Sequence, residues 1–316
     1  MKNIYSNIIK FNSKNLIKII KILKKNDIIG LPTETVYGLA GNAYSNSAIK
    51  KIFKEKKRLK KNPLIIHYYN LNLAKKDVFL DKKFYKIYQK FSPGPLTYIV
   101  KKKNNSRIKP LACANLKTVG IRFPKNRIIR KLLKKLNFPL AMPSANKSSG
   151  VSPVKPSDVF EEFQSKIKIL DGGVSKIGIE STVLNLVGNT CVLRPGIVTP
   201  KQIEKVLKIK VKISSKQTTI KSPGSLKRHY SPGIPIYLNK KNCPEKYAFI
   251  TFGKKYPVTR NSFNLSRKSN LKEAAKNLYK FFRSIKKKGY KKIYVVTIPN
   301  KDIGIAINDR LKRASK

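Results

Sequence analysis

Apolar residues occur in this chain in two patterns, helical spacing and short continuous runs, which predict helices in some segments and strands in others. Apolar residues at positions 16, 19, 20 and 23 recur at helical spacing behind Ser13, a residue type that caps helices. Short apolar runs at 27–31 and 64–69 are bounded by polar and turn residues, so they predict buried strands. The same reasoning predicts helices at 45–57, 84–91, 128–136 and 201–207, and strands at 96–100, 118–123 and 140–142.

The pattern changes character in the last third of the chain. A hairpin is expected where 179–187 and 191–193 meet across Gly188-Asn189. Residues 209–233 are polar, weakly periodic and interrupted by two Ser-Pro-Gly breaks, which favours a linker. Beyond it, alternation of strands and a helix predicts a small α/β domain. We therefore expect a first domain at 1–208, a linker at 209–233 and a second domain at 234–316, with strands at 234–238, 247–252 and 292–298 and a helix at 271–287.

Charge is the most unusual feature of the composition. The 316 residues include 71 Lys and Arg but 15 Asp and Glu, a formal net charge of +56. Only twelve of the 71 are Arg, and Lys, Ile and Asn are abundant throughout, which favours a biased coding composition over a dedicated nucleic-acid site. An RNA-binding surface would be local, and often rich in Arg and in aromatic residues. Weak, salt-sensitive RNA binding follows from the charge in either case.

Several classes of protein are excluded by what the sequence lacks. Cys113, Cys191 and Cys243 have no metal-ligand spacing, and an odd number argues against a disulfide framework. The N-terminal segment has no apolar core of the secretory kind, and no run of about eighteen apolar residues suggests a membrane span. We therefore expect a cytoplasmic protein that does not enter the membrane.

The sequence also limits the chemistry. It contains no phosphate-binding loop of the Walker type, no dinucleotide fingerprint, no zinc-protease helix and no nucleophile elbow. Two histidines exclude a His-rich metal site, and fifteen acids argue against a dense carboxylate cage. No protein side chain is assigned as a metal ligand from composition, and a Mg²⁺ ion, if used, would be held mainly by substrate phosphates.

The stretch from Leu31 to His67 is the strongest candidate for a binding site. Residues 33–35 (Thr-Glu-Thr) follow a predicted strand, and ligands commonly bind where the strands of an open α/β sheet end. Cations cluster at 56–58, and Asn62 and His67 flank the next apolar run. This combination of hydroxyls, cations and turn residues predicts a site for an anionic ligand.

Arginine is scarce, so its positions are informative. Arg58, Arg122 and Arg194 each lie at the edge of an apolar run. A guanidinium grips phosphate or carboxylate with two hydrogen bonds, which favours ligand contact, while a salt bridge is the alternative. Loop carboxylates that could pair with them are interpreted as solvated: Glu34, Asp171 and Glu180.

The remaining candidates are two histidines and two polar loops. His67 lies within a polar motif rich in turn residues, so ligand contact is favoured, whereas His229 is evenly balanced between ligand contact and structure. The loop at 143–150 (Pro-Ser-Ala-Asn-Lys-Ser-Ser-Gly) carries hydroxyl and amide groups that can cradle a phosphate. The loop at 178–182 is similar, and neither loop is specific alone.

Taken together, these segments resemble the L-threonylcarbamoyl-adenylate synthase family, which is built on the YrdC-like domain. The matching motifs over about residues 10–205 are PTETVYGLAGNA, KEKKRLKKNPLIIH, SPGPLT, TVGIRFP, PSANKSSG, GIESTV and LRPG. SPGSLKRHYSP resembles the linker of the longer form, and GIAINDRLKRAS resembles its C-terminal domain. The resemblance implies an α/β protein: a YrdC-like twisted mixed sheet with a basic concave cavity, followed by a small Rossmann-like α/β domain.

The resemblance also implies a reaction. L-Threonine and bicarbonate would give a carbamate that attacks the α-phosphate of ATP, with release of threonylcarbamoyl-AMP and pyrophosphate. A tRNA threonylcarbamoyl-transferase complex would then use the adenylate to modify tRNA. The linker would fold over the cavity and protect the labile adenylate.

Roles for individual residues follow from the same resemblance. Lys56 and Arg58 match the Lys-x-Arg pair of the family and would act in catalysis by holding the triphosphate. His229 would contact the ligand from the linker, although Lys227 stands where the family often has Tyr, and Ser225-Leu226 also departs from the usual pattern. Contacts to threonine are expected from Thr35, His67, Arg122 and Ser181. Contacts to ATP are expected from Arg58, Asn62, Thr118, Met142, Ser144, Asn146, Arg194 and Tyr230.

Two other functions remain open at this point. The YrdC-like fold is also linked to double-stranded RNA binding, so a non-catalytic RNA- or tRNA-binding protein is the main alternative. A relative that uses carbamoyl phosphate is a further one, although the linker and the tail motifs argue against it.

Overall fold

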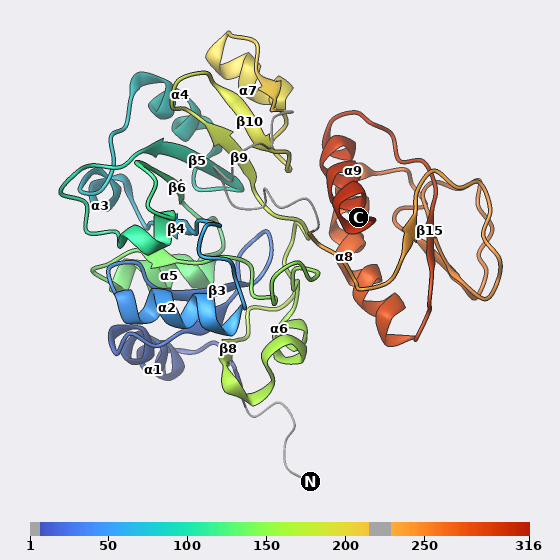
Figure 1. The fold of residues 1–316 in the computed structure, drawn as a ribbon, viewed down its shortest axis with the longest axis horizontal. Helices are drawn as coiled ribbons and strands as arrows, with labels where there is room; N and C mark the ends of the chain where they lie inside the picture. Colours follow the sequence, from blue (N-terminus) through green and yellow to red (C-terminus); the bar gives the residue numbers. More distant parts are fainter. Residues whose placement is uncertain (1–6, 215–228) are drawn as a thin grey trace.

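The computed structural model describes residues 7–214 and 229–316 (Figure 1). In the first of these ranges, eleven strands form one sheet with both parallel and antiparallel pairs. The predicted mixed sheet is therefore confirmed. Its strands, in spatial order, are β1 (Ile8–Ile9), β8 (Lys168–Leu170), β2 (Ile29–Leu31), β3 (Gly38–Asn42), β7 (Leu140–Ala141), β4 (Ile65–His67), β6 (Thr118–Arg122), β5 (Leu96–Lys101), β9 (Thr182–Asn185), β10 (Cys191–Arg194) and β11 (Lys212–Ile213).

The helices of the first domain form where apolar residues recur at helical spacing behind a capping side chain. In α2, Ser45 accepts a hydrogen bond from the backbone of Ala48, and the apolar stripe is buried. The helix ends at Glu55, and Lys57 then adopts a φ of 48°, which turns the chain toward Arg58. The helices are α1 (Ser13–Lys24), α2 (Asn46–Glu55), α3 (Leu71–Lys75), α4 (Lys82–Phe91), α5 (Arg127–Lys135), α6 (Pro156–Phe163) and α7 (Pro200–Leu207), with short 3-10 turns at Pro110–Cys113 and Gln164–Lys166.

Most of the expected elements are present, and the differences have local causes. The cap of α1 is Asn12, whose side chain accepts from Asn15, so the prediction of Ser13 was wrong by one residue. The predicted hairpin forms from β9 and β10. β3 was missed because its sequence, Gly-Leu-Ala-Gly-Asn, has few β-branched or aromatic residues to indicate a strand.

Part of the expected linker forms a β-strand. Lys212–Ile213 forms β11, which pairs in parallel with β10, although these residues were assigned to the linker. Residues 215–228 lie outside the described part of the chain, and the expectations for Ser225, Leu226 and Lys227 lie there.

The second domain has a parallel sheet, as expected for a small Rossmann-like unit. The helix predicted at 271–287 has those bounds in the structure, whereas β14 and α9 were not predicted. None of the helices in residues 7–214 and 229–316 has the length and apolar content of a membrane span. The strands of the second domain, in spatial order, are β12 (Ile236–Tyr237), β15 (Ile293–Val295), β13 (Ala248–Thr251) and β14 (Ser262–Asn264). Its helices are α8 (Leu271–Lys287) and α9 (Ile303–Ala314).

The two domains meet through the helices of the second. Figure 1 shows α8 and α9 between the first domain and β15. Gly178 has a φ of +85°, and a Cβ atom there would lie 2.5 Å from the Cα atom of Lys276 in α8, so glycine permits this close approach. Arg283 of α8 also donates to Glu162 of α6 at 2.9 Å. Val36, Val151, Val154 and Ile179 also belong to the same apolar cluster as the core of the second domain, so contact between the domains uses apolar packing, backbone proximity and ion pairs.

Candidate active site

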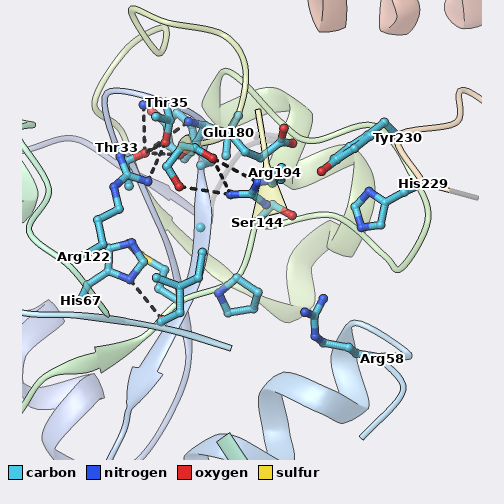
Figure 2. A pocket seen from close by; sticks show the side chains of 17 residues that line it. Thr33, Thr35, Arg58, His67, Arg122, Ser144, Glu180, Arg194, His229 and Tyr230 are labelled. Atoms are coloured by element: carbon cyan, nitrogen blue, oxygen red, sulfur yellow. Dashed lines mark hydrogen bonds between the residues drawn. The ribbon is translucent and has the colours of Figure 1, made fainter. Parts of the chain in front are cut away.

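One cavity collects most of the candidate residues at the ends of several strands of the first sheet (Figure 2). Arg58, Arg122 and Arg194 all line it, so three segments that are distant in sequence converge on one basic cavity. The predicted residues that line the cavity are Thr35, Arg58, His67, Arg122, Met142, Ser144, Ser181, Arg194 and Tyr230.

Arg122 is fixed by the loop that follows β2. Its Nη2 donates to Glu34 Oε1 at 2.6 Å, and its Nη1 donates to Thr35 Oγ1 at 3.0 Å. The second carboxylate oxygen of Glu34 accepts from the backbone of Lys125 and Asn126. Glu34 is buried, so its interpretation as a solvated carboxylate was wrong. The salt bridge considered as the alternative for arginine therefore exists at Arg122, alongside its place in the cavity.

His67 lies beside Arg122 because β4 and β6 are parallel and in register. The two residues are direct partners across the strands, at the edge of the sheet that forms the cavity. Its Nδ1 is 3.2 Å from the carbonyl oxygen of Ile65. Burial, then the positive charge of Arg122, lowers the pKa of His67 well below its usual value, so the ring is neutral at physiological pH. A neutral imidazole beside a guanidinium offers a hydrogen bond without adding charge.

Arg194 and Ser181 together form another part of the cavity wall. The Nε and Nη2 atoms of Arg194 donate to the carbonyl oxygen of Ser181 at 3.1 and 2.9 Å, and Nη2 also donates to the Ser181 hydroxyl at 3.1 Å. That hydroxyl lies 2.8 Å from the hydroxyl of Thr97. The register of β9 and β10 shifts between Val192 and Arg194, which aims the arginine toward this wall.

Glu180 is a cavity residue that the sequence did not identify as functional. Ser152 Oγ donates to it at 2.5 Å, Arg310 Nε at 3.1 Å, and the Tyr279 hydroxyl at 3.0 Å. Burial alone would raise the pKa of Glu180, but Arg310 and Arg194 together lower it. The side chain is therefore a buried carboxylate held largely by the second domain, and its interpretation as solvated was also wrong. Asp171, by contrast, stays partly exposed.

Arg58 enters the cavity from the segment after α2. Its Nη2 donates to Asn62 Oδ1 at 2.6 Å and to the Pro63 carbonyl at 2.9 Å. Burial, then the charge of Arg194, lowers the pKa of Arg58 to about 9, so the guanidinium stays positive at neutral pH. Figure 2 shows Arg58 across the cavity from Arg122 and on the side of His229. The two ends of the cavity are therefore both cationic.

Lys56 is buried behind the cavity rather than in its lining. Its Nζ donates to the carbonyl oxygen of Ser144 at 2.5 Å and to that of Asn146. Burial, then Arg58, lowers the pKa of Lys56 well below its usual value. In this arrangement Lys56 positions the loop that carries Ser144. Four predicted residues do not line the cavity: Lys56, Asn62, Thr118 and Asn146.

The four predicted residues outside the lining differ in their distance from the cavity. Asn62 and Asn146 contact Arg58 and Lys56, so they support the cavity from just behind its wall. Thr118 is the first residue of β6 and pairs with Lys101, at the opposite end of the strand from Arg122. An extended strand advances about 3.3 Å per residue, which separates the ends of β6 by roughly 13 Å.

His229 and Tyr230 close one side of the cavity. The backbone N–H of His229 donates to the Arg313 carbonyl at 3.2 Å, and the Tyr230 ring stacks on Tyr279 with centroids 5.9 Å apart. Burial lowers the pKa of His229 to about 3, so this ring is neutral. The sequence did not decide between ligand contact and a structural role for His229. The structure places this residue in the cavity wall.

Several buried polar atoms around the cavity have no hydrogen-bond partner among the described residues. They are Asn62 Nδ2, Asn146 Oδ1, His229 Nδ1 and the Tyr230 hydroxyl. A buried polar group without a partner costs about 1–3 kcal/mol, so four in one region indicate a place where a polar ligand binds. Within residues 7–214 and 229–316, no group of three His, Cys, Asp or Glu side chains could hold a metal ion.

Some residues that line the cavity were not among the predicted site residues, although several of them lie in the quoted motifs. Thr33, Val36, Tyr37 and Gly38 belong to the same PTETVYG run as Thr35, so the whole run could have been proposed. A Cβ atom on Gly38 would lie 2.3 Å from Met142 Cγ, which explains glycine at this position of the lining. Ile65, Pro143 and Glu180 also lie inside quoted motifs, at positions to which no role was assigned.

Comparison with known proteins agrees with this architecture. Residues 21–196 match the Sua5–YciO–YrdC family model, described as telomere recombination, and residues 198–316 match the model described as threonylcarbamoyl-AMP synthase, C-terminal domain. The chain is 34% identical to the threonylcarbamoyl-AMP synthase of Pyrococcus abyssi, over 93% of this chain and 92% of that protein. It is 32% identical to the enzyme of that name from Bacillus subtilis, over 96% of this chain and 94% of the relative.

Solved structures give the same result. The crystal structure of P. abyssi Sua5 complexed with L-threonine superposes with a TM-score of 0.89 at 30% identity, and the match covers 98% of this chain and 97% of that one. The similarity therefore extends through both domains and confirms the predicted fold class. On these grounds the chain belongs to the threonylcarbamoyl-AMP synthase family, in its two-domain form.

Proposed function

We propose that this protein is a threonylcarbamoyl-AMP synthase, a nucleotidyltransferase that joins L-threonine, bicarbonate and ATP into threonylcarbamoyl-AMP and pyrophosphate. The observation that carries the proposal is the convergence of Arg58, Arg122 and Arg194 on one cavity with the hydroxyls of Thr35 and Ser181. Relatives that match both domains carry this activity in their names, and the P. abyssi relative has been crystallised with L-threonine.

The amino-acid side of the cavity is assigned to Thr35, His67, Arg122 and Ser181. Arg122 would take the threonine carboxylate, because Glu34 and Thr35 fix the plane of its guanidinium before the substrate arrives. The neutral ring of His67 and the hydroxyls of Thr35 and Ser181 supply short-range hydrogen bonds to the polar groups of threonine. Preorganised donors of this kind lower the entropic cost of positioning the substrate.

The nucleotide side is assigned to Arg58 and Arg194, with Met142, Ser144 and Tyr230 in the lining. The carbamate formed from threonine and bicarbonate is anionic, the α-phosphate it attacks is anionic, and the pyrophosphate that leaves is anionic. The cavity needs fixed positive charge more than a covalent nucleophile, since such charge stabilises the negative charge that shifts to the leaving group. Thr118 stays assigned to ATP by family resemblance alone.

Lys56 and Asn146 would act from behind the cavity wall. By holding the carbonyls of residues 144 and 146, Lys56 would fix the loop that presents Ser144 to the phosphates. A Mg²⁺ ion would be carried on the ATP phosphates. The oxygen donor suited to it is Asn146 Oδ1, which is buried and has no partner among the described residues, so the donor chemistry fits.

His229 and Tyr230 would have to move for ATP to enter. The cavity encloses about 50 Å³, far less than the roughly 300–1,000 Å³ of sites that hold small molecules. These two residues form the wall contributed by the end of the proposed linker. Their movement would open the site, and their return would exclude water from the adenylate. The adenylate would then pass to a tRNA threonylcarbamoyl-transferase complex.

The test is a pyrophosphate-release assay on the full chain, with ATP, L-threonine and bicarbonate each omitted in turn. Release is expected only with all three present, and Arg58→Met should reduce it about a hundredfold. Arg127→Met makes the same chemical change at an exposed arginine of α5 and should leave the rate unchanged. Release that does not depend on threonine would contradict the proposal. RNA binding without any release would instead support the non-catalytic alternative.

A further inference from the structure

The sheet of the second domain has one covered face and one aromatic face. Ile293 and Val295 of β15 are fully buried in the apolar core that includes residues of α8 and α9. Side chains alternate across a strand, so Tyr294 lies on the opposite face. Figure 1 shows this sheet on the far side of α8 and α9 from the first domain. The outer face is therefore remote from the cavity.

Three tyrosines form a stacked row across this outer face. Tyr237 of β12 and Tyr294 of β15 are direct partners in register, with ring centroids 5.1 Å apart. Tyr247 lies just before β13, and its ring is 5.8 Å from that of Tyr294 with an interplanar angle of 12°. Tyr237 is 39% exposed, and the other two are half-buried. The row is thus an aromatic surface within reach of solvent.

Lysines lie among these rings. The Nζ atom of Lys292 lies 6.0 Å from the ring centroid of Tyr237 and 5.1 Å from that of Tyr247. Lys246 approaches the Tyr247 ring at 5.4 Å. Cations held near aromatic faces at these distances are attracted by the ring electrons. We call this surface, made of Tyr237, Tyr247, Tyr294, Lys246 and Lys292, the tyrosine face.

A cationic cavity continues the tyrosine face at the starts of the strands. It has a volume of about 540 Å³ and is lined by segments that precede β13, β14 and β15 and by the turn after α8. Lys246 belongs to both features, and Lys291 is adjacent to Lys292. Of its nine lining residues four are cations and one is an acid: Lys246, Arg260, Lys288, Lys291 and Glu245.

Biased composition explains the abundance of the lysines but not the arrangement of the tyrosines. A drift toward lysine spreads charge over every exposed surface, whereas a stacked row in register on one sheet face places aromatic area among those charges. Aromatic rings add affinity for bases that are free to stack, and they add little for a duplex, whose bases are covered. Interleaved rings and cations are therefore matched to a single strand.

We propose that the tyrosine face binds single-stranded nucleic acid, with bases stacked on its rings and the backbone running into the adjoining cationic cavity. The phosphates would be neutralised by Lys246, Lys291 and Lys292. This inference does not rest on the proposed enzymatic function, because the tyrosine face and the active site lie on different domains and share no residue.

The experiment measures fluorescence anisotropy of a labelled oligoribonucleotide of about 12 nucleotides, a length that matches single-strand sites. An oligodeoxyribonucleotide and a duplex of the same sequence are compared over a series of salt concentrations. Binding to one or both single strands that exceeds duplex binding supports the proposal, and the tighter of the two identifies the nucleic acid. Equal binding of single strand and duplex would mean that charge alone is responsible and would overturn it.

Matched variants separate the tyrosine face from the general charge of the chain. Tyr237→Ala should weaken single-strand binding about tenfold. Tyr237→Trp keeps an aromatic ring and should bind like the wild type. Phe79→Ala removes a more exposed ring from the first domain and should have no effect on binding. Lys291→Glu with Lys292→Glu should weaken binding and flatten its salt dependence more than Lys134→Glu with Lys135→Glu on α5. Equal losses within either matched comparison would overturn the proposal.

Discussion

Arg122 donates to Glu34 across 2.6 Å, and both side chains are almost completely removed from solvent. Arg122→Lys keeps the charge but loses the planar fork that Glu34 and Thr35 orient. We expect the KM for threonine to rise about a hundredfold while the KM for ATP changes little. Steady-state kinetics with each substrate varied in turn measures both constants.

Arg130 provides the control for that change. It stacks on Tyr69 outside the cavity, so Arg130→Lys should leave both constants unchanged. A rise in the KM for ATP that matches the rise for threonine would contradict the assignment of Arg122 to the amino-acid side.

Arg58 should give the opposite pattern. Its guanidinium lies at the other end of the cavity, and Arg194 is the charge that acts on it most strongly. Arg58→Lys is expected to raise the KM for ATP about tenfold and to leave the KM for threonine within about twofold, because the nucleotide phosphates lose a bidentate partner. If threonine binding weakened equally, the division of the cavity into two sides would be wrong.

The sequence was sufficient for the parts of the site that lie within single motifs. Thr35 and Ser144 lie in polar loops that follow strands, His67 is the last residue of β4, and strand ends that share a sheet edge bring such residues together. The strand order could not be predicted, since β1 and β2 both pair with β8, more than a hundred residues later in the chain. Periodicity reports which face of a strand is buried but not which strand is its neighbour.

The two buried carboxylates were misinterpreted for the same reason. Glu34 is paired with a residue 88 positions away, and Glu180 with one 130 positions away. Each sits in a loop of turn residues, where carboxylates are usually solvated, and no local pattern indicates a distant partner. The scarcity of acids was a signal that could have been used: in a chain with 15, an acid inside a motif is more informative than usual.

His229 should control part of the response of stability to pH. Its pKa is about 3 in the folded protein and near 6.5 when unfolded, so the unfolded state binds more protons between these values. Stability therefore falls as the pH falls below about 6.5, by about 2 kcal/mol between pH 7 and pH 5 from this residue. Urea unfolding of the wild type and of His229→Asn at both pH values measures the difference.

The variant is needed because Glu180 acts in the same direction. Its pKa is lowered in the folded state, so it also loses stability on acidification, mainly below pH 5. His229→Asn should therefore show a smaller loss between pH 7 and pH 5 than the wild type. An identical loss in both proteins would show that His229 is not buried as a neutral ring.

Arg310 should be among the most costly side chains to remove. It is fully buried, donates to Glu180 at 3.1 Å and to the Pro195 carbonyl at 2.5 Å, and lies 5.2 Å from the Tyr230 ring. Arg310→Met leaves the Glu180 carboxylate buried without its cation, so we expect a loss of about 3–5 kcal/mol in the free energy of unfolding. Denaturant titration of the full chain measures it.

An exposed pair gives the contrast. Lys51 and Asp27 lie 3.1 Å apart with both side chains about half exposed, so Lys51→Met should cost less than about 1 kcal/mol. Similar losses for the two variants would mean that Glu180 finds another partner or becomes protonated when Arg310 is absent.

The placement of α8 and α9 has a consequence for how this protein can change over generations. These helices make the contacts between the domains, so residues on the outer face of the second sheet are not constrained by the geometry of the cavity. Substitutions could accumulate there, and a surface property could be gained or lost, without disturbing catalysis. Substitutions on the helices have no such freedom, because a shift of Arg310 or Tyr279 would move Glu180 in the wall of the cavity.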